Sequence, residues 1–152
     1  VLYCTVNNVN DGRIYGFKNT MTRLSGILYK ILLKESRKLN SVITEYGGFR
    51  AMDDFEELRK EADKLINQGV KMGEGWLITA EMGCLAKTGT ENIVCTQPFG
   101  CLPNHIVAKG MTRKVKEEYP FANIVAIDYD PGATVVNQEN RLKLMIANIK
   151  EK

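Results

Sequence analysis

Two short apolar segments constrain the fold of this chain more than any other feature. Residues 92 to 95 and 123 to 127 are typical of buried strands, and a helix-like run follows each of them. Strands joined through a helix pair in parallel with a right-handed crossover. The sequence therefore predicts an α/β fold, a three-layer Rossmann-like or flavodoxin-like parallel βαβ unit with a helical N-terminal lead-in.

The length of 152 residues suits one domain, over 1–152, with a hydrophobic core. We expect a lead-in of strand and helices over 1–70 and a βαβα core over 71–152. Residues 1 to 18 hold short apolar runs broken by asparagine and glycine, which favours a strand or hairpin followed by a turn. Because the chain has no initiator methionine, we expect a fragment of a larger multidomain protein.

The periodicity of apolar residues, together with helix-breaking and capping residues, predicts five helices. The first begins at Thr20 and runs to about Lys38, before a loop over 40–48; the second begins at Asp53 or Asp54; the third covers 76–87. The fourth covers 105–119, with Asn104 as its cap. The last ends near Asn148. Apolar stripes support the first and last of these helices: Leu24, Ile27, Leu28, Ile31 and Leu32 in one, and Leu142, Met145, Ile146 and Ile149 on the inner side of the other.

Composition and motifs exclude several classes of function. The net charge is +3, from 21 basic and 18 acidic residues, which is too balanced to indicate a nucleic-acid-binding protein. No apolar run approaches the roughly 20 residues that span a membrane, and no signal peptide is visible, so we expect a cytoplasmic protein. The glycine-rich fingerprints of nucleotide-binding loops are also absent from the sequence.

The four cysteines differ in their surroundings. They stand at positions 4, 84, 95 and 101 without a Cys-x-x-Cys pair, which argues against a zinc ribbon or thioredoxin motif. The even count would allow two disulfides, but a domain of this size and apolar content does not need them, so we expect a reducing compartment. Cys84 and Cys95 fall in apolar segments and are predicted to be core residues. Cys101 lies in a loop before a helix start, where helix amides favour a thiolate.

The loop over 95–105 carries most of the ligand-type side chains. In a parallel sheet it would open on the same side as the loop over 128–132, which brings sulfur ligands near two carboxylates. His105 stands four residues after Cys101, with three residues between them, and is either a ligand or, more simply, a surface residue at a helix start. Asp130 reads as a helix cap before Pro131 rather than as a catalytic acid. A zinc site using Cys101 and His105 would need two more ligands.

Four segments resemble the C-terminal region of large CoA-substrate-specific enzyme activases, which are related to 2-hydroxyacyl-CoA dehydratases. They are residues 71–81, 92–105, 122–133 and 136–145, within a similarity that covers roughly 64–146. The block Gln-Pro-Phe-Gly-Cys-Leu-Pro-Asn-His over 97–105 is its most specific part. After Glu81 the chain departs from the family pattern, which makes Cys84 look idiosyncratic.

The resemblance implies an electron-transfer role in anaerobic metabolism, in which a dehydratase-like domain helps to hold an iron–sulfur cluster. It implies Cys101 as a cluster ligand, Gly100 as a point of close backbone approach, and Gln97, Asn104 and His105 as polar cofactor-binding neighbours. The remaining ligands would come from the rest of the parent polypeptide, with its activator ATPase and other dehydratase-like subdomains, or from another subunit. The fragment alone would then lack catalytic competence.

Two other interpretations stay open. The chain could be a non-catalytic scaffold or docking module of the same system, without a cofactor of its own. It could also be a small zinc-binding domain. A homo-oligomer is compatible with each of these interpretations, and none involves nucleic acid or a membrane.

Overall fold

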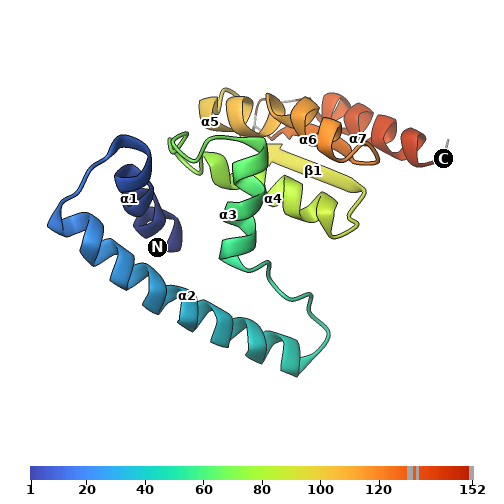
Figure 1. The fold of residues 1–152 in the computed structure, drawn as a ribbon. Coiled ribbons are helices and arrows are strands. Elements are labelled where there is room, and N and C mark those ends of the chain that lie inside the picture. Colours follow the sequence, from blue (N-terminus) through green and yellow to red (C-terminus); the bar gives the residue numbers. More distant parts are fainter. Residues whose placement is uncertain (130–131, 133, 151–152) are drawn as a thin grey trace.

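A computed structural model describes residues 1–129, 132 and 134–150, and Figure 1 shows their mixed α/β arrangement. Helices dominate, and the two strands pair into a short parallel sheet. The elements are α1 (Leu2–Tyr15), α2 (Thr20–Tyr46), α3 (Phe55–Leu65), α4 (Trp76–Lys87), β1 (Asn92–Gln97), α5 (Leu102–Asn104), η1 (His105–Lys109), α6 (Thr112–Glu118), β2 (Asn123–Asp128) and α7 (Val135–Lys150).

The parallel pairing of β1 and β2 confirms the predicted strands and extends each of them slightly. Asn92 lies opposite Asn123, and the register continues to Gln97 opposite Asp128. Ile93 and its partner Ile124 point to one face of the sheet, where α4, η1 and α6 pack against them. Ile127 points to the opposite face, toward α7.

Two apolar clusters form the core, and α4 contributes to both. One cluster joins α4 to the sheet, η1 and α6 through Met82, Ala86, Ile93, Val115 and Ile124, among others. The other joins α4 to α1, α2 and α3, with the fully buried Trp76 at its centre. Side chains on different sides of α4 therefore pack into two different clusters. For this reason α4 is buried on most of its sides.

The predicted strand or hairpin at the N-terminus is wrong, because residues 2–15 form helix α1. Its buried positions include Val6, Asn7 and Asn10, which lie three and four residues apart on one helical face. Two of these are asparagines that bond to other elements: Asn7 accepts from Trp76 Nε1 at 3.0 Å, and Asn10 donates to Gln68 at 2.8 Å. A search for apolar periodicity misses a helix whose buried face is partly polar.

Helix α2 is longer than predicted and presents its apolar stripe differently. Asn19, one residue before the expected start, caps it by accepting from the Thr22 amide at 2.8 Å. The helix continues to Tyr46 through most of the expected loop, and the Asn40 side chain bonds both backbone groups of Met52.

The described residues contain no helix both long and apolar enough to cross a membrane.

The side chains of the predicted α2 stripe are largely exposed rather than packed. Leu24, Ile27 and Ile31 are each more than half exposed, whereas the buried α2 residues are Ser25 and Tyr29. Helix α1 packs against this more polar side, and both lie at the end of the molecule opposite α7 in Figure 1. The periodicity correctly indicated a helix, but the apolar face has no covering element among the described residues.

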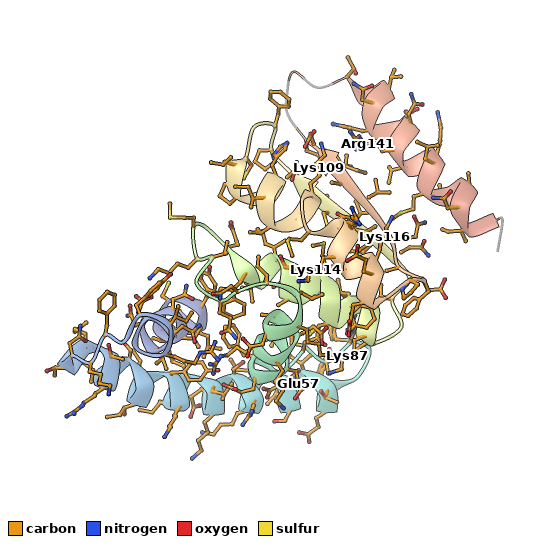
Figure 2. All side chains as sticks on the ribbon, turned by 45° about the horizontal axis from the view of Figure 1, so that its top comes forward. Glu57, Lys87, Lys109, Lys114, Lys116 and Arg141 are labelled. Atoms are coloured by element: carbon orange, nitrogen blue, oxygen red, sulfur yellow. The ribbon has the colours of Figure 1, made fainter. Side chains whose placement is uncertain are left out.

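Helices α3 and α4 agree with the predicted boundaries. Asp54 caps α3, accepting from the Glu56 amide at 2.9 Å, and α4 covers the predicted 76–87. The two helices pack closely, since a Cβ on Gly83 would lie 2.7 Å from Cγ of Glu61. At their outer side, Glu57 and Lys87 form an ion pair at 3.2 Å, and Figure 2 shows both side chains.

The single helix predicted over 105–119 is broken in the structure. A short turn of α5 leads into the wider turns of η1, and α6 starts only at Thr112. A Cβ on Gly110, just after η1, would lie 2.5 Å from the carbonyl oxygen of Ile106, so this position needs glycine. Asn104 has helical backbone angles and is not the predicted cap.

Helix α7 covers β2 with a mixed face rather than the predicted apolar one. Met145 is buried, but Ile146 and Ile149 are about half exposed. Instead, Gln138 and Arg141 donate to the carbonyl oxygens of Asp128 and Ala126, at 3.2 and 3.0 Å. Figure 2 shows Arg141 on α7 beside the sheet. Asp130 and Pro131, the predicted start of this helix, lie outside the described residues.

Candidate functional site at the strand ends

The loops that follow β1 and β2 begin side by side, as predicted from their order. The Tyr129 amide donates to the Gln97 carbonyl oxygen at 2.6 Å, just beyond the paired residues Gln97 and Asp128. The carboxyl ends of parallel strands are the usual position for sites in α/β proteins. The candidate site consists of Gln97, Cys101, Asn104, His105 and Asp128.

Cys101 lies at the first turn after the β1 loop, where its backbone is extended and helix α5 begins at the next residue. Its side chain is half-buried. The Asn104 side-chain amide donates to Cys101 Sγ at 3.0 Å. This sulfur therefore has a donor of the kind that stabilises thiolate or metal-bound sulfur.

His105 is fixed by the backbone of the same turn. Its Nδ1 lies 2.9 Å from the Cys101 carbonyl oxygen, which can only accept, so Nδ1–H is the donor. The Gln97 amide nitrogen lies 3.3 Å from Nδ1 and 3.4 Å from Nε2 of the same ring. His105 is thus a half-buried member of a polar network rather than a freely exposed residue at a helix start.

Gln97 links the two strand ends through its side chain. It is 3% exposed, and its amide nitrogen donates to the Asp128 carboxylate at 2.5 Å. Its carbonyl oxygen, Oε1, is buried with no hydrogen-bond partner among the described residues. A buried acceptor without a donor is costly, typically about 1–3 kcal/mol. The site therefore offers an acceptor that a bound donor would satisfy.

The structure assigns Gly100 a conformational role. Its φ is +72°, in the left-handed region that favours glycine, and no described atom lies within 4 Å of an added Cβ. The close approach of a bound group to this backbone stays a prediction. Gly100 lets the chain turn between Pro98 and Cys101, whose amide bonds the Pro98 carbonyl oxygen at 3.2 Å.

The other cysteines stand apart from this site. Cys84 is buried, and Cys95 lies beside Met82 with its Sγ 3.2 Å from the methionine sulfur, as expected of core residues. Burial raises the pKa of each of these thiols to about 11. Cys4 is exposed on α1, and all four cysteines are free thiols.

A cavity beside the site was not predicted from the sequence. Its volume is about 720 Å³, and it lies between Phe99 of the β1 loop, the end of β2 and helix α7. Its polar lining includes Asp128, Asn137 and Arg141. The α7 residues carried no recognisable motif, and only their spacing of three and four residues could have indicated a shared face.

The structure brings the predicted site residues together but supplies few metal ligands. Across residues 1–129, 132 and 134–150, no three side chains of histidine, cysteine, aspartate or glutamate are grouped closely enough to hold a metal ion. Cys101 is the thiol that this loop contributes. Comparison of the chain with family models, curated proteins and solved structures gives no match.

Proposed function

We propose that this chain is the dehydratase-like part of a CoA-substrate-specific enzyme activase and that Cys101 supplies one ligand to a shared iron–sulfur cluster. The observation that carries the proposal is the half-buried Cys101 sulfur at the strand ends, with Asn104 donating to it at 3.0 Å. Hydrogen bonds to ligand sulfurs are among the features that set a cluster's reduction potential.

The described residues can supply one ligand to a cluster rather than the full set. Clusters of the common four-iron type take four ligands, usually cysteines. The other ligands would come from the remainder of the parent polypeptide or from another subunit, within a larger, cytoplasmic Rossmann-like assembly that also includes the activator ATPase. When bound, the cluster would carry one electron at a time. Gln97, Asn104 and His105 would orient Cys101 and exclude water from its sulfur.

Replacement of Cys101 in the full-length protein tests this proposal. The protein is prepared without oxygen, and iron, acid-labile sulfide and the electron paramagnetic resonance spectrum are measured. We expect Cys101→Ala to lower iron and sulfide content, whereas the control Cys4→Ala, at an exposed position, should leave both unchanged. Unchanged iron, sulfide and spectrum in Cys101→Ala would exclude the ligand role. Stoichiometric zinc in place of iron would favour the zinc-binding interpretation.

A second candidate, a docking module without a cofactor of its own, is favoured by the exposed stripe on α2. Leu24, Ile27 and Ile31 present apolar surface along that helix, and surfaces of this kind mark interaction sites in folded proteins. In that case the Cys101 replacement would leave metal content unchanged, whereas Ile27→Lys would weaken association with the activator ATPase.

A further inference from the structure

The outer edge of β1 is an open strand edge. The Asn123 and Tyr129 amides bond the carbonyl oxygens of Glu91 and Gln97, so the odd-numbered residues of β1 face β2. The backbone groups of Asn92, Val94 and Thr96 therefore point away from β2. They have no backbone hydrogen bond to any described residue. All three residues are exposed, and Val94 is 41% exposed.

The outer edge of β2 is closed in the corresponding places. Its carbonyl oxygens at Ala126 and Asp128 accept hydrogen bonds from Arg141 and Gln138 of α7. Natural proteins cover or charge their strand edges, because bare edges pair with other chains. Helix α7 therefore covers β2 at these two carbonyl oxygens, whereas no described residue bonds the outward backbone groups of β1.

Helix α4 lies where a crossover helix would lie if a strand preceded it. It packs on the same face of the sheet as η1 and α6, which connect β1 to β2. Successive right-handed crossovers in one direction place their helices on one face. A strand before α4 would then run parallel to β1 along its open edge. The element before α4 in this chain is the helix α3, so such a strand would come from elsewhere.

A groove follows this edge beneath α4. Its volume is about 320 Å³, and it is lined by Val94 and Thr96 of the strand and by Ile78 and Leu85 of α4. Apolar side chains on one face of an added strand would fill it, since alternate residues of a strand point to the same face.

The groove is acidic toward the carboxyl end of β1. Glu74 and Glu81 line it there, and neither forms an ion pair with a described residue. Partial burial and the carboxylates of Asp53 and Glu74 raise the pKa of Glu81 above its usual value. A cation at this position would stabilise the Glu81 carboxylate and offset the repulsion from its acidic neighbours.

We propose that the outer edge of β1 binds an extended peptide segment of another polypeptide, parallel to β1, with alternate apolar side chains beneath α4 and a basic residue near Glu74 and Glu81. The backbone of the peptide would pair with Asn92, Val94 and Thr96, the mode of recognition known as strand addition. The groove also touches Asn104, the donor to Cys101, but the inference does not rest on the cluster, because it concerns the outer edge of β1 and the backbone groups of Asn92, Val94 and Thr96.

A fluorescent synthetic peptide tests the proposal. It has six residues, the length of β1, and alternates valine and threonine before a lysine at its carboxyl end. We expect saturable binding by fluorescence anisotropy, with a dissociation constant below about 1 mM, and slower amide hydrogen exchange at Val94 and Thr96. A scrambled peptide of the same composition is the control. No binding, or equal binding of the scrambled peptide, would overturn the proposal.

Two replacements locate the binding. Val94→Pro removes the outward amide without touching the bonds to β2, as proline is tolerated on edge strands, and should weaken binding at least about tenfold. Its control, Val94→Thr, keeps the amide and should bind normally. Glu81→Lys should weaken the lysine peptide and strengthen a peptide ending in glutamate, a result that holds even if Val94→Pro fails to fold.

Two further outcomes would overturn the proposal. If Glu81→Lys leaves the preference between the two peptides unchanged, the groove does not select a basic residue. If the protein alone forms dimers that Val94→Pro separates, as measured by analytical ultracentrifugation, a second copy of this chain occupies the edge instead.

Discussion

Cys101 differs from Cys84 and Cys95 in what surrounds its sulfur. Those two thiols lie against apolar side chains that disfavour a thiolate, whereas Cys101 has an amide donor from Asn104. The residue type alone therefore does not distinguish the cysteines. The hydrogen bond from Asn104 to its sulfur sets Cys101 apart.

The first prediction concerns alkylation of the cysteines. At pH 8, iodoacetamide should modify Cys4 and Cys101 well before Cys84 and Cys95, measured by mass spectrometry of peptides. A thiol with a pKa of about 11 is only about one part in a thousand thiolate at pH 8, and only the thiolate reacts. The two buried thiols should therefore react faster as the pH rises toward 11. Unfolded in urea at pH 8, all four should react alike. Equal rates for Cys95 and Cys4 in the folded protein would contradict the prediction.

At the scale of elements, the sequence predicts best those helices and strands whose buried faces consist of apolar residues. The strands β1 and β2 and the helices α3 and α4 follow apolar patterns with clear caps or breakers, and their positions are confirmed. The meeting of the two strand-end loops follows from their order. Helix α1 was missed because asparagine side chains form part of its buried face, which no hydrophobic period reveals.

The candidate site was also predictable only in part. Its residues and their proximity could be predicted from the sequence, since they crowd into one loop at a strand end. Their hydrogen bonds could not be predicted: the Asn104 side chain donates to sulfur instead of capping a helix, and the Gln97 side chain links the two strands through Asp128. Such contacts depend on side-chain directions within a tight turn, which spacing alone does not fix.

The second prediction concerns the junction between α1 and α4. Asn7→Leu leaves the buried Trp76 indole N–H without its acceptor, and we expect a loss of about 1–3 kcal/mol in the free energy of unfolding. Urea denaturation followed by circular dichroism measures it. In a Trp76→Phe background the same replacement should cost clearly less. An equal cost in both backgrounds would show that the hydrogen bond is not responsible.

At the scale of the whole molecule, α4 joins the two apolar clusters into one structure. Ala80 and Cys84 belong to the cluster with α1, α2 and α3, whereas Met82 and Ala86 belong to the cluster with the sheet. Tyr119, after α6, also donates to the buried Glu61 of α3 at 2.6 Å. Neither half can lose its packing without exposing α4 to water.

The third prediction is therefore a single unfolding transition. Tryptophan fluorescence reports on Trp76 in one cluster, and far-ultraviolet circular dichroism reports on all helices. The two signals should give the same midpoint in urea, as in two-state unfolding. Val115→Ala, in the other cluster, should lower both midpoints together, because its effect passes through α4. A fluorescence midpoint that stays constant while the dichroism midpoint falls would indicate two independent units.

The pairing of β1 with β2 also bears on how fast the chain reaches this structure. Partners such as Asn92 and Asn123 are separated by one crossover, and α1 with α2 and α3 with α4 are consecutive helices. Structures dominated by contacts between near neighbours in sequence fold quickly, since little loop entropy is lost before packing begins. Among the described residues, the side-chain hydrogen bond that spans the longest stretch of sequence, from Asn7 to Trp76, involves α1. Docking of α1 is thus the step with the largest loop to close, and we expect it to come late in folding.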